Sequence, residues 1–413
     1  MAAVTEKNVL YISYDGMTDP LGQSQVIPYL VGLTKKGYSF TILSCEKKAR
    51  YNSHKETISQ LLANASISWE PVFYTKNPPV ISTLYDYQQM KNKAVQLNGQ
   101  LHFDVIHCRS YISALLGLWM KKKYQIPFIF DMRGFWADER IDGGLWDMKN
   151  PVYKTIYRFF KRKEIDFLKE AAAVVSLTEA GKEEMMCWKN LTISADKISV
   201  IPCCADTDTF NPDKVLPVEQ EVKRLKLGIQ PDDFILGYLG SIGTWYLLDE
   251  MIHFFSLLKK ERTHVKLLFV TQDDPAQILN SAQKYGVDEN DLIITSAERK
   301  EVPLMISLFN YGLFFIKPAY SKMASSPTKQ GEIMAMGIPV ICNFGVGDTD
   351  KIIARYNSGL TVVGNQFEEA IYQISLNGVH DQEKIRAGAI DFFSLNNGID
   401  RYNQLYKRIC KQS

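Results

Sequence analysis

The sequence predicts an α/β fold with two domains, each a doubly wound parallel sheet. The chain has 413 residues, which is more than one hydrophobic core usually serves. Short runs of β-branched and aromatic residues alternate with helix-length segments, and this alternation starts afresh near residue 234. Such alternation is typical of parallel sheets with helices on both faces. We therefore expect a first domain over residues 1–205 and a second over residues 206–390, with a cleft between them.

Composition favours a cytoplasmic protein and excludes several other classes. The chain is 46% hydrophobic and 23% charged, and its net charge of +2 gives no argument for nucleic acid as a partner. The N-terminal residues 1–7 show no signal-peptide pattern, and no apolar run approaches the roughly 18 residues that span a bilayer. The seven cysteines form no CxxC pair, so we expect reduced thiols and no structural zinc site.

The first domain reads as six strands with helices between them. An amphipathic helix from Pro28 to Lys36 separates the first two strands, which predicts a βαβ unit. The stretch 206–231 is rich in Asp, Pro and Lys, and we expect it to connect the domains. The expected strands are residues 8–13, 40–44, 105–107, 127–130, 173–177 and 200–202.

The second domain repeats the pattern with a strand that runs into glycines. Each of its apolar runs is separated from the next by a helix-length segment, so we again expect a parallel sheet. Its expected strands are residues 234–240, 265–270, 292–294, 312–316 and 340–341.

The segment 325–341 is the most informative part of the chain. It reads as a polar loop, a short helix that ends at Gly337, and a buried strand. Hydroxyl residues such as Ser326 and Thr328 precede or begin the helix, whose N-terminus and Lys329 suit a phosphate. Glu332 lies about one turn further on and suits a ribose diol, because a carboxylate only accepts hydrogen bonds. The pattern indicates a nucleotide site; the alternative is an ordinary βαβ crossover with a polar loop.

Polar residues also follow three strands of the first domain, where ligands bind in open α/β sheets. Residues 19–25 contain a glycine that serves either a ligand or only the turn. Residues 107–111 and 131–140 hold histidine, arginine and acidic side chains, which indicate either a catalytic site or buried structure and surface ion pairs. The candidates in these loops are Gly22, His107, Arg109, Asp131, Arg133 and Glu139.

Taken in order, these segments resemble a known family. The resemblance rests on residues 14–17 with 22–25, 107–111, 131–134, 177–180, 200–202, 240–245 and 327–332. Together they look like a retaining glycosyltransferase of the GT-B fold, family 4 type. The resemblance implies an acceptor-binding N-terminal domain, a nucleotide-sugar-binding C-terminal domain, and a C-terminal helix over 391–413 that crosses back to the first domain. It also implies that Gly240 and Ser241 lie at the nucleotide-sugar site.

Several positions depart from the family pattern. Glu332 matches the glutamate that contacts ribose, but Ala324 stands where the family commonly has another glutamate. Pro327 has no N–H to offer the pyrophosphate. Arg109 and Arg133 stand where other members often carry histidine, whereas His107 matches.

The charged candidates suggest a reaction that needs no metal or other cofactor. Lys329, Arg109 and Arg133 are expected to neutralise the departing nucleoside diphosphate, as preorganised cations do. Asp131 or Glu139 would orient the acceptor hydroxyl. The Asp-x-Asp patterns at 206–208 and 348–350 resemble metal sites of other glycosyltransferases, but such short patterns arise often by chance.

Three functions remain open. The leading hypothesis is transfer of a sugar from a UDP- or GDP-sugar to a glycan or lipid-linked acceptor, in the synthesis of a surface polysaccharide or glycolipid. The alternatives are a nucleotide-sugar epimerase of the same fold and a non-catalytic nucleotide-sugar-binding protein.

Residues 151–163 contain five basic residues and four aromatic rings. On a helix, Val152, Ile156, Phe159 and Phe160 share a face. That face either packs on the domain core or meets anionic lipid. The second possibility predicts a protein that binds peripherally to the inner face of the cell membrane.

Overall fold

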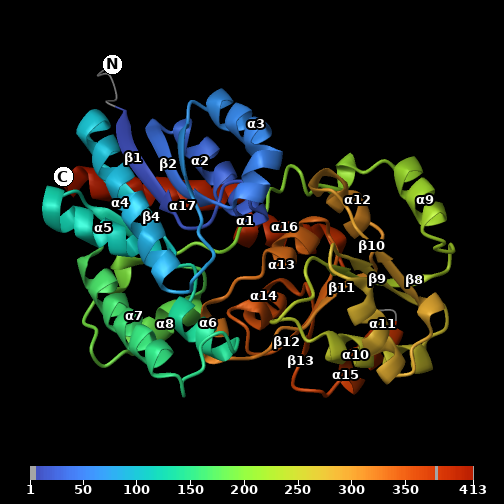
Figure 1. Cartoon of the computed structure of the whole chain (residues 1–413). Coiled ribbons are helices and arrows are strands. Elements are labelled where there is room, and N and C mark those ends of the chain that lie inside the picture. Colours follow the sequence, from blue (N-terminus) through green and yellow to red (C-terminus); the bar gives the residue numbers. More distant parts are fainter. Residues whose placement is uncertain (1–5, 377–379, 413) are drawn as a thin grey trace. The chain divides into compact units, whose positions relative to one another are not determined.

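The computed structural model describes residues 6–376 and 380–412. Residues 1–5, which belong to the N-terminal segment without a signal-peptide pattern, lie outside this description, as do 377–379 of the predicted second domain and Ser413 of the predicted terminal helix. The chain divides into two compact units, with boundaries after Pro202 and after Ser394. The first unit contains residues up to 202 and from 395 onwards, and the second contains residues 203–394. Both units are α/β with an all-parallel sheet, as the sequence predicts (Figure 1).

The first unit is built on a seven-stranded sheet in the order β3-β2-β1-β4-β5-β6-β7. The order reverses at β1, so β1 and β4 form the switch point at which the carboxyl ends of strands create a ligand site. The edge strand β3 was not predicted. The strands are β1 Lys7–Ser13, β2 Tyr38–Glu46, β3 Ser68–Phe73, β4 Val105–Arg109, β5 Phe128–Asp131, β6 Ala173–Ser176 and β7 Ile198–Val200.

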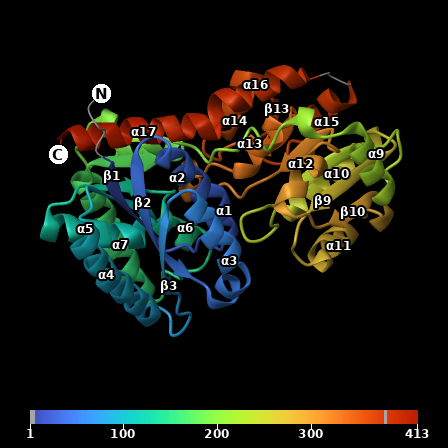
Figure 2. The ribbon, with the colours of Figure 1, turned by 90° about the horizontal axis from the view of Figure 1, so that it is seen from above.

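Helices cover both faces of this sheet: α2 and α17 lie on one side, and α4, α5 and α7 lie on the other (Figure 2). A short 3-10 turn, η1 Ala195–Lys197, precedes β7. The helices of the first unit are α1 Pro20–Gln25, α2 Ile27–Thr34, α3 Lys48–Asn64, α4 Ile81–Leu101, α5 Ser110–Tyr124, α6 Trp136–Asp142, α7 Pro151–Glu170, α8 Glu179–Met186 and α17 Leu395–Gln412.

The C-terminal helix α17 packs on the first unit, as the predicted return of the chain requires. Its apolar side chains recur at helical spacing and are buried: Ile399, Tyr402, Tyr406 and Ile409. The contact with α2 is close, because a Cβ at Gly32 would lie 2.2 Å from Cδ1 of Ile399. Glycine at position 32 therefore allows the two helices to approach.

The second unit is built on a six-stranded sheet in the order β10-β9-β8-β11-β12-β13. Five strands were predicted, and the edge strand β13 was not. The strands are β8 Phe234–Leu239, β9 Val265–Val270, β10 Leu292–Thr295, β11 Tyr311–Phe314, β12 Val340–Asn343 and β13 Gly359–Val362.

The helices of the second unit alternate with its strands. Within the described residues of the whole chain, no helix is both long and apolar enough to span a membrane. The helices are α9 Pro217–Lys226, α10 Leu248–Glu261, α11 Pro275–Lys284, α12 Val302–Ile306, α13 Thr328–Ala335, α14 Thr349–Tyr356, α15 Glu368–Ser375 and α16 Gln382–Phe393, with 3-10 turns at η2 Pro212–Lys214, η3 Glu289–Asp291, η4 Arg299–Glu301 and η5 Tyr320–Ala324.

The prediction that residues 206–231 connect the domains was wrong. This stretch belongs to the second unit and contains α9. Phe210 and Ile229 are buried in the core of that unit. The polar composition misled the prediction because α9 has no buried residue, so its sequence reads like an exposed connection.

Candidate functional site

In the first unit, the predicted catalytic residues meet at the carboxyl ends of β4 and β5. Arg109 and Asp131 are the last residues of these strands and are paired in the sheet register. The residues that follow have left-handed backbone conformations, with φ of 66° at Ser110 and 58° at Arg133. Such strain in residues other than glycine is concentrated at functional sites.

His107 and Asp131 form a buried hydrogen-bonded network with two tyrosines of α17. The His107 Nδ1 atom lies 2.6 Å from the Tyr406 hydroxyl, and its Nε2 atom lies 3.4 Å from Oδ2 of Asp131. The Tyr402 hydroxyl donates to the same Oδ2 atom at 3.0 Å. All four side chains are buried. The sequence did not indicate either tyrosine as part of the site.

Two arginines stand next to this network. Nη1 of Arg133 lies 3.9 Å from Oδ1 of Asp131, and Nε of Arg109 lies 3.3 Å from Oδ2 of Asp15. Asp15, on the loop after β1, was not among the predicted site residues. The arrangement thus contains two guanidinium groups and two carboxylates, with Arg109 almost fully buried.

Burial and charge set the protonation of the network. Burial acts to raise the pKa of Asp131, but the charge of Arg133, the hydrogen bond with His107 and the charge of Arg109 outweigh it and lower that pKa. Burial lowers the pKa of His107, although its hydrogen bond with Asp131 opposes this. At neutral pH Asp131 is therefore an ionised acceptor, and His107 is a neutral imidazole.

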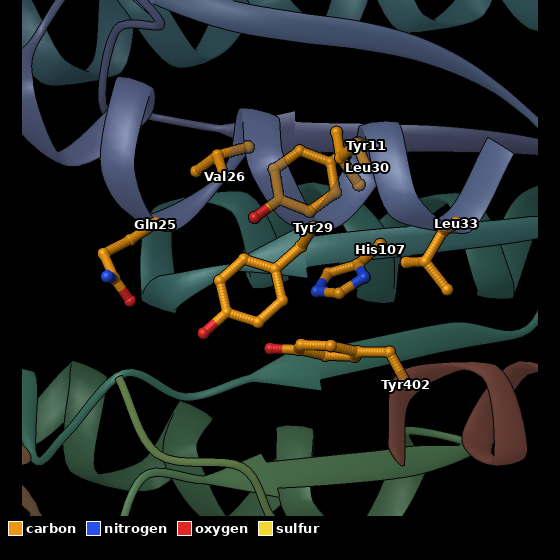
Figure 3. A pocket seen from close by; sticks show the side chains of 8 residues that line it. All are labelled: Tyr11, Gln25, Val26, Tyr29, Leu30, Leu33, His107 and Tyr402. Carbon is orange, nitrogen blue, oxygen red and sulfur yellow. The ribbon is translucent and has the colours of Figure 1, made fainter. Parts of the chain in front are cut away.

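His107 lies inside the unit. It lines a small cavity between the sheet, α2 and α17, where the rings of Tyr11, Tyr29 and Tyr402 surround it (Figure 3). Its side chain is only 3% exposed. Both ring nitrogens are engaged with protein groups, so His107 is placed to orient Asp131. The complete lining is Tyr11, Gln25, Val26, Tyr29, Leu30, Leu33, His107 and Tyr402.

The other two candidates of the first unit lie on neighbouring segments. Glu139 lies in the first turn of α6, just after the β5 loop, and is partly exposed. Gly22 lies in α1, where a Cβ would meet the Gly16 oxygen at 2.3 Å and the Met17 Cα at 2.6 Å. Gly22 thus lies in a helix and not in the expected turn, and close backbone packing leaves no room for a side chain there.

A carboxylate that the sequence did not indicate holds the loop after β1. The buried side chain of Glu46 accepts hydrogen bonds from the Met17 amide at 2.6 Å and from the Thr18 amide at 3.2 Å. It also accepts one from the Ser44 hydroxyl at 2.6 Å. Glu46 thus fixes the loop that carries Asp15 and leads to Gly22.

In the second unit, Lys329 is enclosed by aromatic rings at the N-terminus of α13. Its Nζ atom lies 4.1 Å from the ring centre of Tyr238 and 3.6 Å from that of Tyr246. Gly240, with φ of 100°, follows β8, and a Cβ there would lie 3.7 Å from Lys329 Nζ. The structure therefore brings Lys329 and Gly240 together, although they are 89 positions apart in the sequence.

Burial lowers the pKa of Lys329 well below its usual value, while the charges of Glu332 and Asp273 oppose this shift. A bound anion would favour the charged amine, because opposite charges stabilise each other where water is excluded. Lys329 is thus suited to a phosphate ligand.

Glu332, one turn into α13, pairs with a residue that the sequence did not indicate. Nη1 of Arg299 lies 2.6 Å from its Oε1 atom, and the Arg299 guanidinium also lies 4.8 Å from the ring centre of Phe210. Burial raises the pKa of Glu332, whereas the charge and the hydrogen bond of Arg299 oppose the rise. Glu332 is almost completely buried, but the Arg299 side chain is 53% exposed, so the partner of this carboxylate is accessible to a ligand.

The remaining predicted residues surround the start of α13 or the end of β8. Thr328 is the first residue of α13, and the Ser326 hydroxyl accepts a hydrogen bond from the Cys203 amide at 3.2 Å. The exposed Ser241 follows Gly240, and its hydroxyl accepts from the Gly243 amide at 3.2 Å. The helix ends close to Gly337, whose φ of 74° fits the predicted stop.

Family models match both units. The model described as Glycosyltransferase Family 4 matches residues 26–209, and the one described as Glycosyl transferases group 1 matches residues 219–390. The chain is a group 1 glycosyltransferase of the family 4 type. No curated protein matches this glycosyltransferase.

Solved structures share the fold of this glycosyltransferase along nearly its whole length. A glycosyltransferase from Rickettsia africae is 18% identical with a TM-score of 0.73, covering 99% of this chain and 100% of its own. HepE from Anabaena, in complex with UDP-glucose, is 15% identical with a TM-score of 0.69, covering 97% and 99%. WaaG, a glycosyltransferase involved in lipopolysaccharide biosynthesis, is 16% identical with a TM-score of 0.68, covering 96% and 99%. These likenesses confirm the predicted GT-B fold.

Proposed function

We propose that this glycosyltransferase transfers a hexosyl group from a UDP- or GDP-sugar to a glycan or lipid-linked acceptor, with retention of configuration, in the synthesis of a cell-surface polysaccharide or glycolipid. The observation that carries the proposal is the placement of Lys329 and Glu332 about one turn apart at the start of α13, where both side chains are buried. One group suits a diphosphate and the other a ribose diol. The UDP-glucose complex of HepE and the role of WaaG in lipopolysaccharide biosynthesis agree with this proposal.

The donor diphosphate would bind at the N-terminus of α13, where the helix dipole and Lys329 would stabilise negative charge. As the bond between sugar and diphosphate breaks, charge develops on the leaving oxygen, and Lys329 would offset it. Glu332 would accept hydrogen bonds from the ribose hydroxyls while Arg299 keeps it ionised. Arg109 and Arg133 of the first unit would add positive charge for the departing diphosphate. Asp131 or Glu139 would orient the acceptor hydroxyl.

We further propose that the reaction requires no divalent metal. Lysine and arginine groups supply the positive charge that a metal provides elsewhere. In the Asp-x-Asp pattern at 206–208, the Asp206 carboxylate accepts hydrogen bonds from the Asp208 amide at 3.0 Å and from the Thr209 hydroxyl at 2.7 Å. That carboxylate is therefore used in a local turn. Activity that persists in excess EDTA is expected; complete loss, restored by Mg²⁺ or Mn²⁺, would contradict the proposal and point to Asp348 and Asp350.

We also propose a peripheral membrane contact through α7, on the inner face of the cell membrane. Val152 and Phe159 are exposed there, and Lys154, Arg158 and Arg162 are exposed on the same helix. Exposed apolar groups with flanking basic residues suit the headgroup region of anionic lipid. A lipid-linked acceptor would reach the enzyme from such a surface.

The function is tested by a thermal-shift screen over UDP-, GDP- and ADP-sugars, followed by product analysis. A donor that binds only the folded protein must raise its melting temperature. Transfer to an acceptor with an unchanged anomeric configuration is the expected result. A new epimer formed without acceptor would establish the epimerase instead. Binding with neither transfer nor donor hydrolysis would establish a non-catalytic binding protein.

A further inference from the structure

We propose that Tyr402 and Tyr406 of α17, here called the α17 tyrosine pair, are positioning residues for the reaction. They hold the hydrogen of His107 on Nε2 and fix the Asp131 carboxylate, so that Asp131 presents its second oxygen towards Arg133. The proposal rests on the proposed function, because its consequence is the rate of sugar transfer. Its structural part concerns one proton and one carboxylate, and it can be tested without any substrate.

The placement of the proton follows from the partners of His107. An ionised carboxylate can only accept a hydrogen bond, so the Nε2 atom that faces Asp131 must carry the hydrogen. A neutral imidazole then has an acceptor at Nδ1, which lies 2.6 Å from the Tyr406 hydroxyl. Burial raises the pKa of Tyr406 well above its usual value, so this hydroxyl keeps its proton and donates it. Tyr406 therefore selects one tautomer of His107.

The orientation of Asp131 follows from its two oxygens. Oδ2 accepts from the Tyr402 hydroxyl at 3.0 Å and faces Nε2 of His107 at 3.4 Å. Oδ1 is the atom nearest to Arg133, with an N–O distance of 3.9 Å. With Oδ2 held by two donors, rotation of the carboxylate would leave a buried donor unpaired, which is costly. Tyr402 thus keeps Oδ1 available to the arginine.

Aromatic packing keeps the network in place. The His107 ring centre lies 4.6 Å from that of Tyr11, 5.5 Å from that of Tyr402 and 5.9 Å from that of Tyr406. These ring contacts restrict the orientation of the His107 side chain. Tyr402 donates a hydrogen bond to Asp131 directly, whereas Tyr406 donates to His107. We therefore expect the loss of the Tyr402 hydroxyl to lower kcat more than the loss of the Tyr406 hydroxyl.

The experiment compares Tyr402→Phe and Tyr406→Phe, which keep the rings and remove only the hydroxyls. The chain has six histidines, and ¹⁵N spectra of the full-length protein resolve their ring nitrogens, with His107→Gln assigning the His107 signals. We expect a single Nε2-protonated tautomer in the parent protein and a mixture of tautomers in Tyr406→Phe. In Tyr402→Phe we expect kcat to fall about 10- to 100-fold, as for groups that orient a reacting residue, with donor KM changed by less than about threefold.

Tyr38→Phe is the matched control. The Tyr38 hydroxyl is also buried and donates to Oδ1 of Asn403 on α17 at 3.1 Å, and its ring packs on Tyr406. The Tyr38→Phe substitution therefore removes a hydroxyl that holds the same helix but does not hydrogen-bond to His107 or Asp131. We expect parental kcat and parental His107 signals in this variant.

Three results would overturn the proposal. The first is a parent protein with the hydrogen on Nδ1 of His107. The second is a Tyr402→Phe enzyme with parental kcat. The third is a Tyr38→Phe enzyme that loses as much activity as Tyr402→Phe, because the effect would then come from docking α17. If no substrate is turned over, the proposed function fails, and the ¹⁵N spectra still decide the placement of the proton.

Discussion

At the scale of single residues, Lys329 and Glu332 could be predicted because the pattern that indicates their role lies within one short segment of the sequence. A basic and an acidic side chain one turn apart at the start of a helix can be read directly from the sequence. Their partners could not be predicted in this way. Tyr238, Tyr246 and Arg299 reach α13 only through the order of strands in the sheet, which a single sequence does not reveal.

The proposed role of Glu332 gives the first prediction. Glu332→Ala should lower donor binding or transition-state stabilisation by about 2 to 4 kcal/mol, as expected for losing charge-assisted hydrogen bonds to a ribose diol. The fold should remain intact, because the variant removes a buried carboxylate rather than a packed apolar group. Steady-state kinetics and the melting temperature measure the two effects.

The control for this variant is Glu301→Ala, which removes a carboxylate from the η4 segment beside Arg299 without touching α13. Glu301 pairs with Lys223 at 3.6 Å and is partly exposed. Parental kinetics are expected there. Unchanged kinetics in Glu332→Ala itself would remove the assignment of a nucleotide ribose to this carboxylate.

At the scale of elements, strands with continuous apolar runs were predicted, and both missed strands are at the edges of their sheets. The β3 run Ser68–Phe73 contains Glu70 and Pro71 and has no buried residue, and β13 begins with Gly359. An edge strand needs only one hydrogen-bonded neighbour and is partly exposed, so its sequence lacks the signal of a buried strand.

Helix α7 shows how a helical pattern can mislead in detail. Phe160 of the predicted apolar face is buried, but Val152 and Phe159 of the same face are exposed. Lys161, one of the five basic residues of this segment, pairs with Asp138 at 2.8 Å and with Glu164 at 2.5 Å. The helix therefore divides its predicted face between the core and the surface.

The exposed part of α7 gives the second prediction. Sedimentation with anionic liposomes should recover the protein in the pellet in a salt-sensitive manner, since each basic residue near anionic lipid contributes about 1 kcal/mol. Changing Lys154, Arg158 and Arg162 to Gln should abolish this binding. The control variant changes the three basic residues in the last turn of α9 to Gln and should sediment like the parent protein. Equal recovery in the supernatant with anionic and neutral liposomes would disprove the membrane contact.

The buried carboxyl of α7 gives the third prediction. Burial raises the pKa of Glu164 to about 7, although Lys161 and Tyr111 oppose the rise. The unfolded chain loses this proton near pH 4.5, so the folded state binds more protons between pH 4.5 and about 7. Stability from this group therefore falls as the pH rises through that window, by about 3 kcal/mol for a shift of this size.

Glu164→Gln should remove this dependence. The difference in melting temperature between pH 5 and pH 8 should be smaller in Glu164→Gln than in the parent protein. Glu170→Gln, which alters a more exposed carboxylate of the same helix, should behave like the parent. An equal pH dependence in the parent and in Glu164→Gln would show that Glu164 is ionised throughout this range.

At the scale of the whole molecule, repeated strand–helix alternation was enough to predict two parallel-sheet units. The structure divides them between Pro202 and Cys203, three residues before the position expected from the sequence. The return of α17 to the first unit was expected from the family resemblance alone. Its amphipathic pattern could not show which surface it covers.

The division into units gives the fourth prediction. All the predicted nucleotide residues except Gly22 lie in residues 203–394. If the expressed segment folds, the nucleotide of the preferred donor should raise its melting temperature, by mass action on the folded state. The same segment with Glu332→Ala should show a smaller rise. A folded segment that does not respond, beside a full chain that does, would show that residues of the first unit bind the nucleotide.

The return of α17 also has a consequence for synthesis of the chain on the ribosome. His107 emerges early, but Tyr406, its hydrogen-bond partner, is made 299 residues later. In the sequence, the second unit is a continuous segment inserted between the two parts of the first unit. Domains generally fold as they emerge from the ribosome. The unit that is begun first is therefore completed last, with its α2 surface and the His107 cavity uncovered until α17 has been made. A nascent chain stalled before residue 395 should then recruit chaperones through the first unit, although that unit's sheet has long been translated.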